Sequence, residues 1–234
     1  MNASSDGSAL VFGASGVIGT AIAGWFANHG RSVVGISRSG SGGASTLAWT
    51  PEDPGTAFDM LGPGPLGAVV WAQGMNLSDD IRSFDLARHR EVYEANVVYI
   101  LQSLQLLLEN GLVARGTRLV VISSIWQDIA RQNKLSYCVS KSALSGLVRS
   151  LAAELGPDGI TINAVLPGPL DTPMTRANLS AAQIDQIANA APLKSLPVLE
   201  DVCETVGFLC SSDNTGITGQ FIAADRGFSR VRYV

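Results

Sequence analysis

A tyrosine and a lysine stand four residues apart in the segment SYCVSKSALSGLVRSLAAEL, which covers residues 136–155. The segment is rich in Ala, Ser, Leu and Val and predicts an amphipathic helix, on which residues i and i+4 share one face. Tyr137 and Lys141 would therefore lie side by side. A phenol has an ordinary pKa of about 10, and a neighbouring cation is expected to lower it. Such a pair is suited to exchanging a proton with a substrate.

Chance is a poor explanation for this pair. The chain has four tyrosines and three lysines among 234 residues, so about 0.05 accidental matches to this spacing are expected. The strand pattern RLVVISS ends at Ser123 and Ser124, and Ser124 precedes Tyr137 by thirteen residues. The carboxyl end of a strand is where open α/β sheets bind ligands. Either serine could also simply end the strand.

A glycine-rich turn follows the first predicted strand in ALVFGASGVIGTAIAG. Gly13, Gly16 and Gly19 form the spacing G-x-x-G-x-x-G at the opening of a helical pattern. Glycine permits unusual backbone angles and lets the chain approach a pyrophosphate, which the positive end of the helix dipole favours. The turn therefore predicts a dinucleotide site, with a purely structural turn as the alternative.

The end of the second predicted strand indicates which dinucleotide is bound. A carboxylate there would accept the ribose hydroxyls of NAD and repel a 2′-phosphate. The sequence VVGISRSG offers Ser37 and Arg38 instead, and the planar donors of Arg suit a phosphate. This favours NADP(H), with NAD(H) still possible. The alternative is that Arg38 is an ordinary solvated cation.

The elements that position these residues alternate along the chain. Apolar runs predict strands at Ala9–Phe12, Val33–Ser37, Ala68–Ala72, Arg118–Ser123, Thr161–Leu166 and Phe221–Ala224, with a weaker one at Leu47–Trp49. Helical patterns fall at 17–29, 80–88, 91–110, 137–155, 180–190 and 199–211. Consecutive apolar positions predict strands covered on both faces. We expect an α/β fold: a single doubly wound Rossmann-type domain over 1–234, with a seven-stranded, mainly parallel sheet.

The composition narrows the class of partner. A net charge of −4 and a pI near 5.1 argue against nucleic acid and anionic membranes. Three cysteines without C-x-x-C spacing and two distant histidines predict neither a disulfide framework nor a metal site. We see no secretion signal and no apolar run long enough to span a membrane, so a cytoplasmic protein is expected.

The order of several motifs resembles the short-chain dehydrogenase/reductase family, in particular its 3-oxoacyl-reductase-like, carbonyl-reducing members. The resemblance covers nearly the whole chain, through GASGVIG, WAQG, YEANVV, VVISS, YCVSK, INAVLPGPLDTPM and GITGQFIAADRGF. It implies hydride transfer between a nicotinamide and a carbonyl/alcohol pair on a small-molecule substrate. It also implies a substrate loop at about 170–198 and a homodimer or homotetramer, to which the apolar helices 91–110 and 137–155 would contribute.

The resemblance also implies site residues. Tyr137 would be the general acid/base, Lys141 would lower its pKa and bind the nicotinamide ribose, and Ser124 would polarise the substrate carbonyl. Asn96 would hold a water in a proton relay to the lysine. The residues implied to bind the cofactor are Gly13, Ser15, Gly16, Val17, Ile18, Gly19, Ser37, Arg38, Ala72, Gly74, Tyr137, Lys141, Pro167, Gly168, Leu170 and Thr172. Taken alone, Asn96 could be a polar helix residue, and Thr172 could cap a helix that begins at Pro173.

Two motifs depart from the family pattern. In the glycine turn, Phe12 stands where a threonine is usual before the first glycine, and the spacing G-x-x-G-x-x-G replaces G-x-x-x-G-x-G. WAQG (71–74) replaces N-N-A-G, which puts the central-strand hydrogen bonds and the adenosine contacts in question. The glycine spacing and WAQG are the hints for one alternative function, a non-catalytic dinucleotide-binding regulatory protein. The other alternative is an NAD-linked alcohol dehydrogenase.

Overall fold

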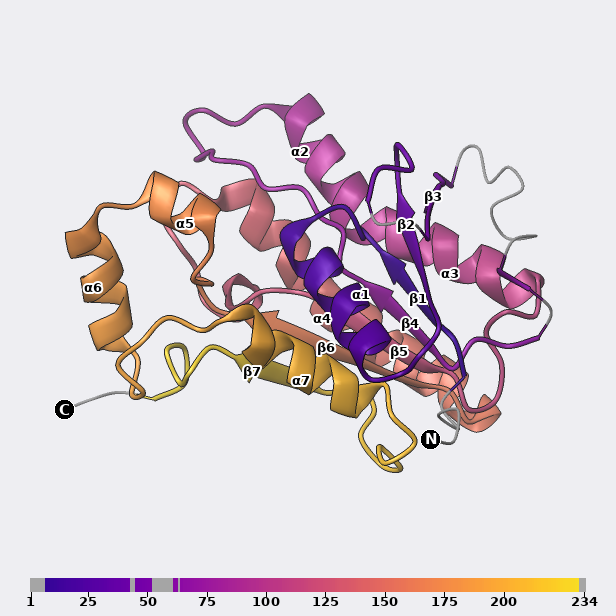
Figure 1. The fold of residues 1–234 in the computed structure, drawn as a ribbon. Helices are drawn as coiled ribbons and strands as arrows, with labels where there is room; N and C mark the ends of the chain where they lie inside the picture. The colour runs from indigo at the N-terminus through magenta and orange to yellow at the C-terminus, as the bar shows by residue number, and fades with distance from the viewer. Residues whose placement is uncertain (1–6, 43–44, 52–60, 63, 232–234) are drawn as a thin grey trace.

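The structure is a computed structural model, and it describes residues 7–42, 45–51, 61–62 and 64–231. Its centre is a seven-stranded sheet in the order β3-β2-β1-β4-β5-β6-β7 (Figure 1). Every strand pair is parallel, which confirms the doubly wound fold. The strands are β1 (Ala9–Phe12), β2 (Val33–Ser37), β3 (Thr46–Ala48), β4 (Ala68–Trp71), β5 (Arg118–Ile122), β6 (Thr161–Pro167) and β7 (Phe221–Ala224).

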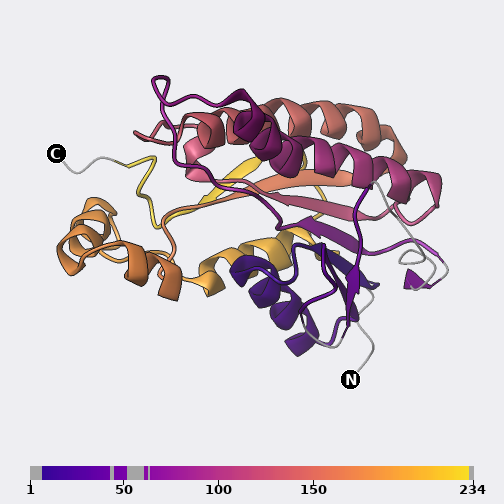
Figure 2. The same cartoon turned by 90° about the horizontal axis from the view of Figure 1, so that it is seen from above.

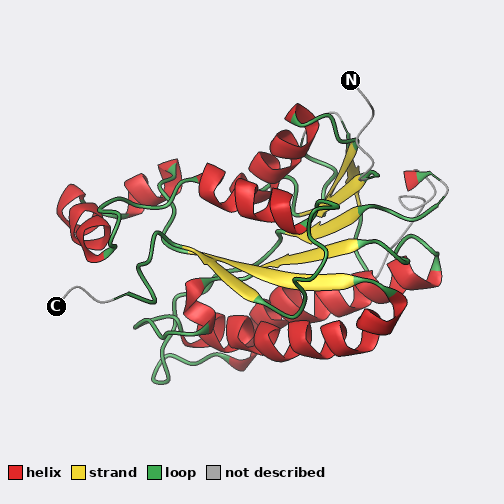
Figure 3. Ribbon diagram, turned by 90° about the horizontal axis from the view of Figure 1, so that it is seen from below, coloured by secondary structure: helices red, strands yellow, loops and turns green. Residues whose placement is uncertain are grey.

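Helices cover both faces of the sheet, as Figures 2 and 3 show from above and below. One face packs against α1 (Val17–Asn28) and α7 (Leu199–Leu209), and the other against α3 (Tyr99–Glu109) and α4 (Leu135–Leu155). Alternate residues of a strand serve opposite faces. In β1, Leu10 and Phe12 join the core on the α3–α4 side. None of the described helices is long and apolar enough to cross a membrane.

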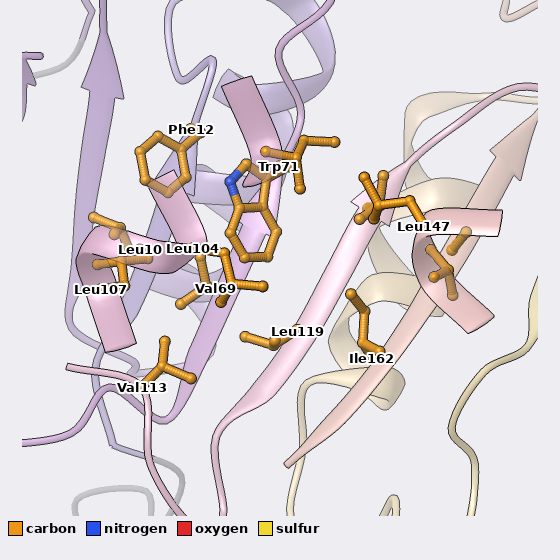
Figure 4. Packing of buried hydrophobic residues seen from close by; sticks show 14 of the residues in the cluster. Leu10, Phe12, Val69, Trp71, Leu104, Leu107, Val113, Leu119, Leu147 and Ile162 are labelled. Carbon is orange, nitrogen blue, oxygen red and sulfur yellow. The ribbon is translucent and has the colours of Figure 1, made fainter. Parts of the chain in front are cut away.

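Two departures from the family pattern pack against each other. Phe12 and Trp71 are register partners in β1 and β4, and their rings stack at 5.7 Å between centroids, side by side in Figure 4. Trp49 and Tyr99 pack around Phe12 at 5.5 and 5.8 Å. The Trp71 indole donates to Ser103 Oγ at 2.8 Å. Aromatic packing therefore occupies the part of the central strands where the family pattern has polar residues. Each such ring pair contributes about 0.5–1.5 kcal/mol to stability beyond the burial of its surface.

The helix predicted at 80–88 is wrong over 80–85 and correct only for 86–88, the first residues of α2. Residues Arg82 and Ser83 instead donate their backbone N–H to Asp80 Oδ1, which makes a turn. Helix α2 (Leu86–Tyr93) begins only after Asp85, whose carboxylate accepts the N–H of Ala87 and Arg88.

Other helix boundaries also differ from the prediction. The helix predicted at 91–110 is the continuation of α2 through a π-helical turn, Glu94–Val98, into α3. Helix α4 begins two residues earlier than predicted, and the described part of the connection from β2 to β3 contains no helix. The segment after β6 forms α5 (Pro173–Asn178) and α6 (Ala181–Ala190), which extend past the end of the sheet (Figure 1).

Candidate active site

The carboxyl end of β5 and the first turns of α4 bring three predicted side chains together. Ser124 follows β5 and accepts the Trp126 N–H at 3.3 Å, and its hydroxyl lies close enough to the Tyr137 phenol to lower the pKa of that phenol. Lys141 Nζ lies 5.7 Å from the centre of the Tyr137 ring and donates to the carbonyl oxygen of Ile122, the last residue of β5, at 3.0 Å. The serine, tyrosine and lysine therefore form one cluster at the edge of the sheet.

Burial dominates the electrostatics of this cluster. The Lys141 side chain is only 4% exposed, and burial lowers its pKa to about 8. Burial also raises the pKa of the Tyr137 phenol, and the hydrogen bond from Ser124 offsets only part of this. The sequence predicted a lowered phenol pKa, and that prediction is wrong for this structure because desolvation outweighs the polar contacts. The phenol is therefore protonated at neutral pH and is poised as a proton donor.

Asn96 lies in the π-helical turn, a deformation that occurs often at functional sites. Its amide Nδ2 donates to the Met75 carbonyl at 3.0 Å and to Ser140 Oγ at 2.8 Å, and its Oδ1 accepts from the Met75 N–H at 2.7 Å. A Cβ on Gly74 would lie 3.1 Å from Asn96 Oδ1 and 3.6 Å from Lys141 Nζ. Asn96 is thus adjacent to the lysine, as predicted, and its amide is held by the protein. Its role in a water relay stays a prediction.

A polar network at the start of α4 was not predicted. The buried Asp79 carboxylate accepts from the Ser136 N–H and hydroxyl, and Ser136 Oγ lies 2.9 Å from His89 Nδ1. Lys134, at the helix start, provides no side-chain cap, so Asp79 serves this end of α4 from a distant loop. The network fixes the residue immediately before Tyr137.

One signal for this network was available in the sequence. Ser136 and Ser140 precede Tyr137 and Lys141 by one residue each, so they share the neighbouring face of the helix. Both serines are fully buried. Asp79 gave no such signal.

A cavity of about 650 Å³ lies at the glycine turn, and none of Ser124, Tyr137 and Lys141 lines it. Among the residues predicted to bind the cofactor, its lining includes Gly13, Ser15, Gly16, Ser37, Arg38, Ala72 and Gly74. Gly13 has φ +76°, and a Cβ there would lie 2.5 Å from the backbone nitrogen of Gln73. A Cβ on Gly19 would lie 2.2 Å from the Gly13 carbonyl oxygen. Both glycines are therefore required by the close approach of the turn to the segment after β4 and to the first turn of α1.

The glycine turn fits a dinucleotide. Helix α1 begins at Val17 and has no side-chain cap, so the N–H groups of its first turn, at Val17, Ile18 and Gly19, face the approach used by anions at helix N-termini. Ser37 is buried and its hydroxyl donates to the Ser41 carbonyl oxygen at 2.9 Å. Arg38 is exposed at the cavity, so its guanidinium is available to a ligand, whereas the Ser37 hydroxyl already uses its one proton on Ser41.

The remaining predicted residues lie at the end of β6. Pro167 pairs with Ala224 of β7, and a Cβ on Gly168 would lie 2.9 Å from Asp225 Cβ, so this turn is tight. Leu170 is buried in the core on the α1–α7 side. Thr172 caps α5 by accepting from the Thr175 N–H at 3.2 Å, with Pro173 at the first position. The capping interpretation of Thr172 is thus correct, and it leaves contact with the cofactor untested.

Comparisons with known proteins identify the relatives of this chain. The family model for enoyl-(acyl carrier protein) reductase matches residues 64–229. The 3-oxoacyl-acyl-carrier-protein reductase FabG of Pseudomonas aeruginosa is 31% identical over 237 residues, which cover 94% of this chain and 96% of that protein. Glucose 1-dehydrogenase of Gluconobacter oxydans is 30% identical, covering 94% and 91%. The chain belongs to the short-chain dehydrogenase/reductase family.

Solved structures agree on the fold. The ligand-free aldohexose dehydrogenase of Thermoplasma acidophilum superposes with a TM-score of 0.86 at 24% identity, covering 98% of this chain and 96% of that one. A dehydrogenase/reductase of Sinorhizobium meliloti 1021 gives 0.83 at 25% identity, covering 96% and 95%. As a short-chain dehydrogenase/reductase, the protein is an NAD(P)-dependent oxidoreductase that acts on CH–OH or C=O groups.

Proposed function

We propose that this short-chain dehydrogenase/reductase reduces a carbonyl group on a small-molecule substrate with NADPH. The observation that carries the proposal is the contact between Ser124 and Tyr137 beside the buried Lys141. A protonated phenol, held next to a hydroxyl donor at the carboxyl edge of the sheet, suits a reaction in which an oxygen gains a proton.

In this reaction the carbonyl carbon gains a hydride and the carbonyl oxygen gains a proton. Bound NADPH would supply the hydride. The Ser124 hydroxyl orients and polarises the carbonyl oxygen, and Tyr137 donates the proton to it. Lys141 stabilises the phenolate that remains, and the path past Asn96 returns a proton from solvent. Tyr137 is protonated at neutral pH, so it can act as the proton donor in this reduction.

The preference for NADP(H) rests on Arg38, which lines the cavity beside the glycine turn. A guanidinium there would bind the 2′-phosphate. The alternative is NAD(H). It is favoured by Glu91 and Glu94, which also line the cavity, because their carboxylates would accept hydrogen bonds from ribose hydroxyls and repel a phosphate. The first turn of α1 and the turns at Pro167–Gly168 and Thr172 would hold the pyrophosphate and nicotinamide.

Several further features belong to this proposal. The segment at about 170–198 would form the substrate loop. Exposed apolar side chains on α3 and α4, among them Leu101 and Val139, would be covered in a homodimer or homotetramer. We place the enzyme in the cytoplasm. The FabG relatives suggest 3-oxoacyl thioesters as the first substrates to try.

The test is NADPH consumption against a panel of ketones, oxoacyl thioesters, keto sugars and quinones. We expect at least one carbonyl to be reduced, and faster with NADPH than with NADH. If the protein binds a dinucleotide but turns over none of these classes, the rival interpretation as a non-catalytic dinucleotide-binding regulatory protein gains the support. Faster reaction with NADH would favour the NAD-linked enzyme.

A further inference from the structure

The amide of Gln73 is buried without a hydrogen-bond partner. Its Nε2 and its Oε1 are both shielded from water, and neither contacts a donor or acceptor among the described residues. A buried amide that makes no hydrogen bond costs free energy, so such groups are rare unless a ligand pairs with them. Gln73 takes the alanine position of the family's N-N-A-G motif, where the adenosine contacts were in question.

Gln73 itself lies at the dinucleotide cavity, and its shielded amide lies behind the surface that its backbone presents there. The Gln73 backbone lies against Gly13 of the glycine turn, and the residue itself lines the cavity. Tyr99 and Gln102 of α3 line the same cavity, as does Thr50 after β3. Arg38 marks the ribose end of this space. The part of the cavity that Gln73 lines is therefore the part in which the adenine base of the dinucleotide would lie.

The chemistry of the amide restricts which chemical groups on a ligand can pair with it. Nε2 donates and Oε1 accepts, so full pairing requires an acceptor and a donor side by side on the ligand. A phosphate offers acceptors alone and would leave Oε1 unpaired. Adenine offers its N6 amino group next to a ring nitrogen, which is the arrangement that glutamine pairs with in two hydrogen bonds. This reasoning rests on the proposed cofactor.

We propose that Gln73 recognises the adenine ring of the dinucleotide through its side-chain amide. The residue is a binding determinant for the adenosine half and has no part in the proton chemistry. In the free protein the amide is an unsatisfied group, and cofactor binding supplies its partners. Removing the amide should therefore weaken binding without destabilising the free fold.

The experiment compares wild type with Gln73→Met, which keeps an unbranched side chain of similar length and lacks the amide. Calorimetry would measure the affinity for NADPH, for 2′,5′-ADP and for reduced nicotinamide mononucleotide, and a thermal melt would be run without ligand. We expect Gln73→Met to bind NADPH and 2′,5′-ADP about tenfold more weakly, to bind the mononucleotide as wild type does, and to melt at the same temperature or higher. Gln105→Met, on the exposed face of α3 and outside the cavity lining, is the matched control and should leave the three affinities unchanged.

Three results would overturn the inference. NADPH affinity within twofold of wild type would show that the amide does not bind the cofactor. An equal loss for the mononucleotide would assign the amide to the nicotinamide half. A lower melting temperature with weaker binding of every ligand would make Gln73 a structural residue. If wild type itself bound neither NADPH nor NADH, the proposed function would fail first, and this inference with it.

Discussion

Replacing Lys141 by methionine should stabilise the fold while abolishing activity. The side chain is 4% exposed, and its pKa of about 8 lies below the ordinary 10.5. That difference corresponds to about 3 kcal/mol by which the folded state disfavours the ammonium form. Methionine removes this cost but loses the hydrogen bond to the Ile122 carbonyl, worth about 1 kcal/mol. The net expectation is a gain of about 2 kcal/mol in the free energy of unfolding at pH 7.

The pH dependence identifies the cause. Because the folded pKa is depressed, the unfolded chain binds the proton more tightly between about pH 8 and 10.5, and wild-type stability gains from Lys141 as the pH rises through that window. Below pH 8 both states are protonated and the full cost is present. Lys141→Met should therefore melt about 4–8 °C higher than wild type at pH 7, and the advantage should shrink above pH 8.

Thermal melts of both proteins from pH 6 to 10.5 would measure this difference. Other titrating groups are common to the two chains, so subtraction isolates the lysine. A variant that melts below wild type at pH 7, or a difference that stays constant across the window, would refute the argument that burial of the ammonium is costly here.

Four further predictions concern other residues. Tyr137→Phe should lower turnover by at least about 100-fold and leave NADPH affinity within twofold, measured by steady-state kinetics and calorimetry; an active variant would remove the phenol from the mechanism. Arg38→Ala should weaken the binding of NADPH about tenfold and leave the binding of NADH unchanged. An equal loss of affinity for both cofactors would make NAD(H) the better assignment. Ser136→Ala should lower the free energy of unfolding, measured with urea, by about 1 kcal/mol. It should also lower kcat while changing the KM for the cofactor less, whereas an unchanged kcat would limit the role of the Asp79 network to stability. Leu101→Glu should shift light scattering from oligomer to monomer, and a wild-type monomer would contradict the interface on α3.

The local part of the site could be predicted from the sequence. Tyr137 and Lys141 are neighbours because of helical periodicity alone, and Ser124 is placed by the end of a buried strand. The glycine turn could be predicted because only glycine tolerates the close contacts at positions 13 and 19, so the residue type itself marks the turn.

Contacts between distant segments could not be predicted. Asp79 is 57 residues from Ser136 and His89 is 47 residues from it, so no spacing rule links them. The stacking of Phe12 on Trp71 depends on strand register, which the sequence leaves open.

The direction in which the Tyr137 pKa is shifted could be predicted only by knowing how deeply the phenol is buried. The sequence showed the cation one turn away, and the structure shows that desolvation is the stronger influence. The late start of α2 at Leu86 had a readable cause, the Asp85 cap. The helical pattern at 80–88 led instead to a predicted start at residue 80.

Isotope transfer tests the central claim most directly. NADPH carrying deuterium at the transferable position of the nicotinamide would be incubated with a carbonyl from the panel, and the alcohol would be analysed by mass spectrometry. We predict one deuterium on the former carbonyl carbon with wild type and no labelled alcohol with Tyr137→Phe. An alcohol without deuterium, or equal labelling by the phenylalanine variant, would contradict direct hydride transfer assisted by Tyr137.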